Sequence, residues 1–326
     1  VLRRVLEWYP ARHNAWYLLG VNLGASGQNE AAIEALQQAI TLNDRFAAAH
    51  SALGNVYIAL NRHDEAQAAY DQALTVDPSS SRGHGGLGAV HQALGHPEQA
   101  IAAYEKAIES DTQYVDARIG LGQMYLAAGN HELSLDILSE AESLAPSRPV
   151  VHNALGDAYI AMRRPEEAIA SFQKAVELEP AFAPTYCGMG RAYRALGRPE
   201  TAIAAYQRAA ELAPGEGEPF AGLADLHADA GRNEQAIAAY ERAIELGFVS
   251  ADLYNRLAAA YRLTGQYNAA LATHEKAQEY DSSHPIAYDS LGQVFMALEQ
   301  HDRAQDAYRR AVENDETNAV ALTGLA

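Results

Sequence analysis

Histidine is the side chain best suited to ligating a metal or moving a proton near neutral pH, and this sequence of 326 residues contains 12 of them. Their spacing argues against a metal site. His84 and His91 are seven residues apart, and neither an HExxH nor a CxxC motif accompanies them. We therefore interpret the histidines as partly buried packing residues and expect no bound metal.

A glycine-rich segment offers a second kind of chemistry. Residues 83–88 read GxGxxG, the pattern whose backbone amides hold the pyrophosphate of a dinucleotide. That site needs a preceding β-strand and a βαβ unit. Residues 77–82, just before the motif, are typical of a turn instead. We therefore expect these glycines to lie in a helix and no cofactor to bind.

Nucleophilic catalysis has no supporting pattern. The sequence contains no GxSxG elbow, and nothing around its single cysteine, Cys187, marks a nucleophile. One cysteine also cannot form an internal disulfide. We therefore expect no enzymatic activity within this segment, while the parent protein and its compartment stay open.

Composition narrows the class of partner. Lys and Arg number 24 against 42 Asp and Glu, for a formal net charge of −18. Nucleic acids and anionic lipids are recognised by clustered Lys and Arg, so we expect neither as a partner. No window approaches 18 consecutive apolar residues, and we therefore expect no insertion into a membrane.

A period of 34 residues runs through the whole chain. Taking His13 as position 1 of the first repeat, position 4 is mostly large, positions 7 and 8 are mostly Leu-Gly, and the register never slips. The residues at position 4 are Trp16, His50, His84, Arg118, His152, Tyr186, Phe220, Tyr254, Tyr288 and Leu322.

Two amphipathic helices are predicted in each period. Apolar or small residues recur at positions 4, 7, 8 and 11, and again at positions 20, 24 and 27. Glycine is expected to end the first helix, because it adopts positive φ without steric cost. It occupies position 15 in six repeats, as Gly27, Gly95, Gly129, Gly197, Gly231 and Gly265.

This pattern resembles the tetratricopeptide repeat. Repeat five carries its marker residues, Leu155, Gly156, Tyr159, Ala168, Phe172, Ala175 and Pro180. The resemblance implies an all-α fold, an α-solenoid in which antiparallel helix pairs stack into a right-handed superhelix, with the first helices lining its concave groove.

The period also predicts the organisation of the chain. Residues 1–12 are expected to be the second helix of a truncated preceding repeat, and residues 319–326 the start of a truncated tenth. Self-association through these open ends is a further hypothesis. The nine full repeats expected between them are 13–46, 47–80, 81–114, 115–148, 149–182, 183–216, 217–250, 251–284 and 285–318.

The groove lining follows from the resemblance, which places positions 2, 5, 9, 12 and 13 of the first helix toward a ligand. We expect Ile58, Ile119, Leu126 and Ile160 to take apolar anchors, and Arg191 and Arg194 to hold an acidic group. The candidate binding residues are Tyr17, Val21, Asn55, Ile58, Arg82, Ile119, Gln123, Leu126, Asn153, Asp157, Ile160, Arg191, Arg194, Asp225 and Arg262.

We thus expect a non-enzymatic scaffold that binds an extended peptide or a partner helix of another protein. Two alternatives stay open: the substrate-recruiting arm of a larger transferase, similar to O-GlcNAc transferases or sulfotransferases, and a periplasmic scaffold for polysaccharide or pilus export. Four glycines in the first helix of repeat three, at 83, 85, 86 and 88, further predict that this helix exchanges its amide hydrogens faster than its counterparts in repeats five and six.

Overall fold

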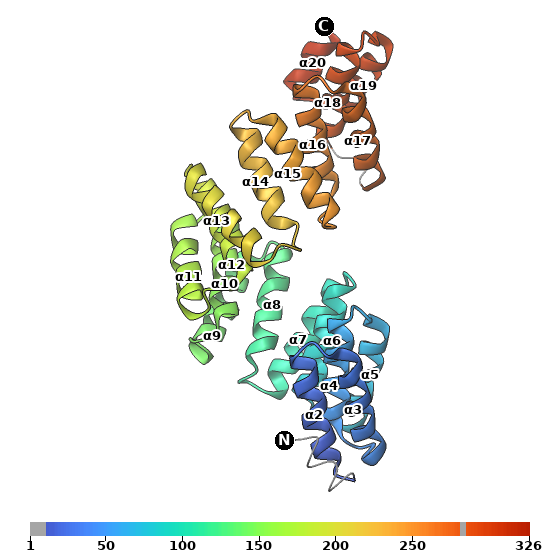
Figure 1. Ribbon diagram of the computed structural model, residues 1–326, viewed down its shortest axis with the longest axis vertical. Coiled ribbons are helices and arrows are strands. Elements are labelled where there is room, and N and C mark those ends of the chain that lie inside the picture. Colours follow the sequence, from blue (N-terminus) through green and yellow to red (C-terminus); the bar gives the residue numbers. More distant parts are fainter. Residues whose placement is uncertain (1–10, 281–284) are drawn as a thin grey trace. The chain divides into compact units, whose positions relative to one another are not determined.

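The computed structural model describes residues 11–280 and 285–326, and all regular secondary structure within these ranges is α-helical (Figure 1). This confirms the all-α prediction. The helix expected at residues 1–12 falls almost wholly outside the described residues. The first helices of the repeats are α2 (His13–Ala25), α4 (Ala47–Ala59), α6 (Ser81–Ala93), α8 (Val115–Ala127), α10 (Pro149–Ala161), α12 (Ala183–Ala195), α14 (Glu218–Asp229), α16 (Ala251–Leu263), α18 (Pro285–Ala297) and α20 (Ala319–Leu325).

The second helices alternate with them along the chain. They are α3 (Asn29–Leu42), α5 (His63–Val76), α7 (Pro97–Ser110), α9 (His131–Leu144), α11 (Pro165–Leu178), α13 (Pro199–Leu212), α15 (Asn233–Glu245), α17 (Tyr267–Tyr280) and α19 (His301–Asn314).

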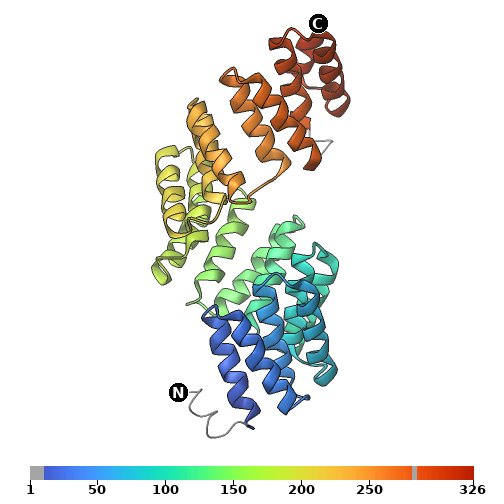
Figure 2. The same cartoon turned by 45° about the vertical axis from the view of Figure 1, so that its right-hand side comes forward.

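The chain divides into two compact units, Val1–Met162 and Arg163–Ala326. Within each unit every helix packs against the next one, and first helices of consecutive repeats also touch, as in α4 against α6 and α12 against α14. The helix pairs α2–α3 and α4–α5 lie side by side in both ribbon views (Figures 1 and 2). Each unit is therefore an α-solenoid, a stack of antiparallel helix pairs.

A left-handed residue follows the first helix of each full repeat. The six glycines at position 15 have φ between 66° and 76°, which confirms the reason predicted for them. The same conformation occurs at Asn61, Arg163 and Glu299, the non-glycine residues at this position, with φ of 56°, 57° and 58°. The turn geometry is thus common to all nine repeats, whichever residue the sequence supplies.

Aromatic rings at position 24 fill the space between repeats. The Tyr70 ring, for example, packs so closely on Gly54 and Gly86 that a Cβ on either glycine would overlap it. Position 24 of one repeat therefore meets position 6 of the next, and a large residue at the first position faces a small one at the second in every pair except Tyr240–Arg256. The pairs are Leu36–Ala52, Tyr70–Gly86, Tyr104–Gly120, Leu138–Ala154, Phe172–Gly188, Tyr206–Gly222, Tyr240–Arg256, His274–Ser290 and Tyr308–Gly324.

The glycines of α6 are explained by the same packing. Tyr70, Tyr104 and Tyr114 press their rings against Gly86, Gly88 and Gly85. These glycines stand inside a helix, as expected, in a segment that has no β-strand before it. The faster amide exchange expected for α6 stays a prediction.

Side chains at position 4 bond to the turn before their own helix. The histidines here are indeed buried or half-buried, and each ring also places Nε2 near a backbone carbonyl oxygen six residues earlier. Such bonds fix the turn that joins consecutive repeats. The contacts are His50–Asp44 (3.1 Å), His84–Pro78 (3.0 Å), His152–Pro146 (2.7 Å) and the hydroxyl of Tyr186 with Pro180 (3.0 Å).

Candidate functional site

The first helices of unit 1 carry two adjacent pockets. One, of about 250 Å³, lies between α2 and α4 and is lined by Val21, Gly24, Ala25, Asn29, Ala52, Asn55, Val56 and Ala59. The other, of about 310 Å³, spans α4, α6 and α8 and is lined by Asn55, Ile58, Tyr70, Gly85, Gly86, Ala89, Tyr104, Tyr114, Asp116 and Ala117. Asn55 belongs to both, so it stands on the ridge between them.

Asn55 is held by a buried phenol. The hydroxyl of Tyr70 donates to its side-chain oxygen Oδ1 at 2.6 Å. Burial raises the pKa of Tyr70 far above its ordinary value, so the hydroxyl keeps its proton and acts as a donor. With Oδ1 engaged, the exposed amide of Asn55 still has N–H groups to offer a ligand.

The glycines of α6 open the larger pocket. Residues 85 and 86 have no side chains to fill it, and the rings of Tyr70, Tyr104 and Tyr114 surround the space. The hydroxyl of Tyr104 donates to Gln92 Oε1 at 2.8 Å. The pocket therefore combines apolar ring surface with fixed polar atoms, as ligand pockets generally do.

Residues of the connecting turns add to this face, and the repeat pattern did not point to them. Phe46, at position 34, packs on Tyr17 with ring centroids 5.1 Å apart. Tyr114, at the same position two repeats later, lies over Gly85. Arg148, the residue just before α10, donates to Asp116 Oδ1 at 2.6 Å. A large side chain at position 34 is the signal that could have revealed them.

Ile119 requires a correction. It is only 6% exposed and packs in a core cluster with Leu138, Val151 and Leu155, so its side chain is not available to anchor a ligand. Leu126 and Ile160 are half-buried and keep part of their surface.

The polar candidates of unit 1 differ in their surroundings. Arg82 and Gln123 are exposed. Asn153 donates from Nδ2 to Asp157 Oδ2 at 3.3 Å, so these two candidates contact each other.

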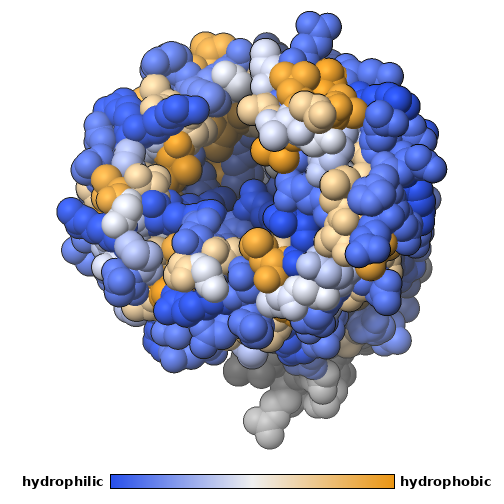
Figure 3. Space-filling model, turned by 90° about the horizontal axis from the view of Figure 1, so that it is seen from above, coloured by the Kyte–Doolittle hydropathy of each residue, from blue (hydrophilic) through white to orange (hydrophobic). Residues whose placement is uncertain are grey.

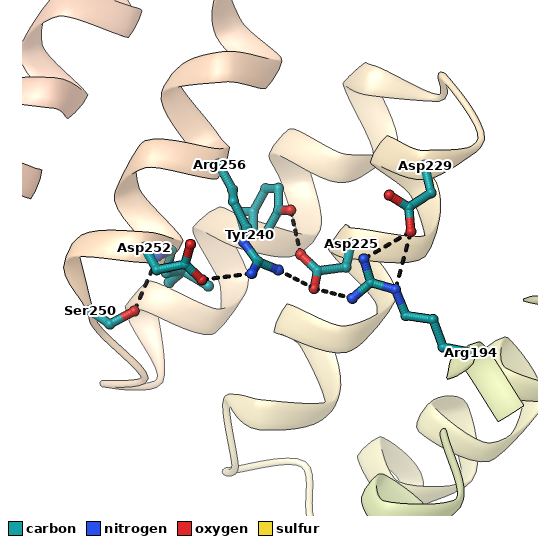
Figure 4. A network of polar contacts seen from close by, with 8 residues as sticks. Arg194, Asp225, Asp229, Tyr240, Ser250, Asp252 and Arg256 are labelled. Atoms are coloured by element: carbon teal, nitrogen blue, oxygen red, sulfur yellow. Dashed lines mark hydrogen bonds and ion pairs between the residues drawn. The ribbon is translucent and has the colours of Figure 1, made fainter. Parts of the chain in front are cut away.

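In unit 2 the candidates Arg194 and Asp225 belong to a charged network on α12, α14 and α16 (Figure 4). Arg194 donates from Nη1 to Asp225 Oδ2 at 2.6 Å, and from Nε and Nη2 to Asp229 Oδ2 at 3.1 and 2.8 Å. Arg256 reaches Asp225 from the other side and Asp252 at 2.7 Å. Each arginine thus faces two carboxylates from the chain itself.

Asp225 is the centre of this network. Its side chain is only 13% exposed, and Oδ1 accepts from the hydroxyl of Tyr240 at 2.6 Å. Burial opposes ionisation, but hydrogen bonds from Arg256 and Tyr240 and the nearby charges outweigh it, so the pKa of Asp225 is lowered. Asp225 is therefore an anion that is already neutralised by neighbouring repeats.

The arginines expected to hold an acidic group of a ligand already contact acids of the chain. Besides the Arg194 pairs, Arg191 Nη1 lies 3.6 Å from Glu218 Oε1. Whether a ligand carboxylate also binds there stays untested. Arg256 was missed, because position 6 holds small residues in most repeats; an arginine there, 31 residues after Asp225, is the signal that could have found it.

Arg262 has different surroundings. Its Nε is buried and has no hydrogen-bond partner among the described residues. Its charge also acts on His274, which is buried between Asn255 Oδ1 (3.1 Å from Nδ1) and Ser290 Oγ (3.0 Å from Nε2). Arg262 therefore borders a neutral polar cluster.

The described residues give little support for a metal site or a membrane-spanning helix. Within 11–280 and 285–326, no three His, Cys, Asp or Glu side chains gather as metal ligands would. None of the helices there has both the length and the hydrophobicity needed to cross a membrane. On the face seen in Figure 3, apolar residues form small separate patches among hydrophilic ones.

Comparison with known proteins identifies the repeats. Residues 23–90 and 86–149 each match a family model described as tetratricopeptide repeat. Residues 147–324 match the model described as cilia and flagella-associated protein 70 C-terminal domain. No curated protein matches the chain.

One solved structure supports the fold, and two others are similar to part of the chain. TTC0263, a thermophilic tetratricopeptide-repeat protein of Thermus thermophilus, is 26% identical with a TM-score of 0.52, covering 56% of this chain and 98% of its own. MamA (24% identity, TM-score 0.41, covering 49% and 94%) is also similar. So is YrrB, a tetratricopeptide-repeat protein described as having an unusual peptide-binding site (20%, 0.40, covering 57% and 95%).

The marker residues, the helix pairs and the family matches all identify the same repeat. Repeats of this kind build protein-interaction scaffolds. The chain therefore belongs to the tetratricopeptide-repeat proteins, and more than half of it falls in the family described as the cilia and flagella-associated protein 70 C-terminal domain.

Proposed function

We propose that the chain is a non-enzymatic scaffold that binds an extended peptide segment of a partner protein along the first helices of unit 1. The observation that carries this proposal is the placement of Asn55 between the two pockets. An extended peptide places alternate side chains on one face, about 7 Å apart, with a backbone carbonyl between them. Two adjacent pockets with an amide donor on the ridge between them suit a ligand of this kind.

Val21 and Ile58 supply apolar surface to the two pockets, one residue in each. The ligand side chains they favour are therefore apolar or aromatic, with the buried tyrosines as the ring surface. Backbone hydrogen bonding at Asn55 gives affinity, and the pockets give selectivity.

A random peptide library displayed on phage tests this proposal. Peptides selected on the wild-type chain should lose about tenfold or more in affinity for Asn55→Ala and for Ile58→Glu, measured by fluorescence anisotropy. Gln72→Glu is the matched control for the added charge, since Gln72 is exposed on the second helix α5.

Folding must be separated from binding in this experiment. Ile58 is half-buried against the core of repeats one to three, so Ile58→Glu can destabilise the unit. Asn55 is exposed, but Asn55→Ala removes the acceptor of the Tyr70 hydroxyl and can also lower stability. Thermal unfolding of all variants makes the distinction. Selected peptides that bind the Asn55 and Ile58 variants as tightly as the wild type would contradict the proposal.

The transferase-arm and export-scaffold alternatives stay predictions. The reading frame of the parent protein distinguishes them: a glycosyltransferase or sulfotransferase domain favours the first, and a signal peptide with a downstream barrel favours the second.

A further inference from the structure

A separate pocket of about 260 Å³ lies in unit 2, among α12, α14, α15 and α16. Its apolar wall consists of Ala228, Ala259, Ala260 and Leu263. Leu263 is 58% exposed, the largest value among the exposed large hydrophobic residues of the described chain. A long aliphatic group would find a surface here that lacks a partner.

The charged rim of the pocket is the network of Figure 4. Two guanidinium groups, Arg194 and Arg256, meet three carboxylates, Asp225, Asp229 and Asp252, so the formal charge of the group is −1. The excess negative charge lies at the surface, since the side chains of Asp229 and Asp252 are 60% and 43% exposed and that of Asp225 only 13%.

The pocket has more unused acceptors than its network of ion pairs first suggests. Both hydrogen bonds to Asp229 end on Oδ2, and Figure 4 shows its other oxygen turned away from Arg194. Asn233, which also lines the pocket, has an Oδ1 that accepts no hydrogen bond from any described residue. The Asn233 Oδ1 is buried, so it calls for a donor, and the outer oxygen of the exposed Asp229 is open to one.

We infer that this pocket takes an arginine or lysine side chain of a peptide segment of the partner protein. The inference rests on the proposed function, and it names the ligand chemistry of a second binding site on the chain. The aliphatic stem lies on the alanines and Leu263, and the cationic end meets the outward oxygen of Asp229, as amphipathic cationic side chains do at an apolar surface beside an acid.

An acidic group is disfavoured at the same place. It would compete with Asp225 and Asp229 for Arg194, and it would leave the largely buried Asp225 with less neutralisation. On this inference a cation is held beside Arg194 by the acids paired with it, while the sequence-based expectation that Arg194 holds an acid of the ligand stays a prediction.

Methyl resonances test the inference without an identified partner. In the whole chain labelled with ¹³C at Ala and Leu methyls, Nα-acetyl-arginine amide and Nα-acetyl-lysine amide are titrated, with Nα-acetyl-glutamate amide as the acidic probe. We expect saturable shifts of Leu263 and Ala259 with the two cations, weakened in about 0.5 M NaCl because salt screens exposed charges. The glutamate probe should leave both methyls unshifted.

Asp229→Asn should weaken the cation shifts about fivefold, since it removes the outward carboxylate. Asp302→Asn is the matched control, because Asp302 is an exposed acid on α19 that does not line the pocket. Equal shifts with the glutamate probe, equal weakening by both variants, or no saturable shift with either cation would overturn the inference.

The two proposals fail separately. If the affinity of the selected peptides depends on Asn55 but neither cation shifts the Leu263 methyl resonances, the inference is wrong and the proposed function is still supported. If both cations shift the Leu263 methyl resonances but the affinity of the selected peptides does not change in Asn55→Ala, the proposed function is wrong and the cation site is still supported.

Discussion

Gly188 shows how one missing methyl group decides the packing between two repeats. A Cβ at this position would overlap the ring of Phe172, which is fully buried in unit 2. Gly188→Ala should therefore lower the free energy of unfolding by about 1–3 kcal/mol, despite the better helix propensity of alanine. Urea unfolding followed by circular dichroism measures the change.

The chain supplies its own control for this substitution. Leu138 is followed by Ala154 where Phe172 is followed by Gly188, and both members of the smaller pair are buried. In a Phe172→Leu background Gly188→Ala should be neutral or stabilising. A double-mutant cycle with no coupling between the two sites would contradict the size-compensation rule.

His274 makes the stability of unit 2 sensitive to acid. Burial, and then the charge of Arg262, lower the pKa of His274 to about 4, below its ordinary value of about 6.5. The unfolded chain therefore takes up the proton first, so stability is complete above about pH 6.5 and falls as the pH drops toward 4. The loss is on the order of 3 kcal/mol.

Thermal unfolding at about pH 7.5 and about pH 5 checks this expectation. His274→Gln, which cannot ionise, should show a smaller drop in midpoint between the two conditions than the wild type. His96→Gln, a substitution of an exposed histidine, should keep the wild-type drop. Identical drops in all three proteins would refute the assignment.

At the scale of elements, the turn after the first helix has an unfavourable backbone conformation in the three repeats where a residue other than glycine occupies position 15. Arg163 and Glu299 hold a left-handed conformation that glycine adopts freely. Arg163→Gly and Glu299→Gly should each raise the free energy of unfolding by up to about 1 kcal/mol, measured by urea unfolding.

The reverse substitution isolates the same backbone term. Gly129 has φ of +76°, and a Cβ there would meet no atom within 4 Å. Gly129→Ala should therefore cost about 1 kcal/mol from the backbone alone. If the glycine substitutions at 163 and 299 destabilise the chain instead, the side chains there make contributions that the turn geometry does not explain.

Much of the helical framework was predictable from the sequence, because each local signal agrees with the period. Gly95 stops a helix and Pro97 begins the next one. The candidate site was less predictable. Whether Ile119 is buried or open depends on how α8 packs on its neighbours, and Arg256 reaches the centre of the site through Asp225 of a different helix, α14. The 34-residue period predicts where helices end, but it does not predict which side chains of neighbouring repeats contact each other.

At the scale of the whole molecule, a stack of repeats need not unfold in one step, because each repeat contacts only its neighbours. Both tryptophans, Trp8 and Trp16, occur within the first 16 residues, so their fluorescence reports on one end of the chain. We expect the tryptophan transition in urea to come at a lower midpoint than the far-ultraviolet circular dichroism transition. Coincident curves would indicate a single cooperative unit.

The pairing of position 24 with position 6 of the next repeat also limits how the chain can be rearranged. Repeats that look alike as sequences are not interchangeable parts, because each one presents a ring or an aliphatic group that only certain successors can accept. A repeat with a tyrosine at position 24, such as Tyr206, can precede one with glycine at position 6, whereas His274 bonds the serine at position 6 of the repeat after it. Shuffled or duplicated 34-residue repeats would therefore fold only where the residue at position 24 of one repeat fits the residue at position 6 of the next. This requirement limits the order in which the repeats can follow one another.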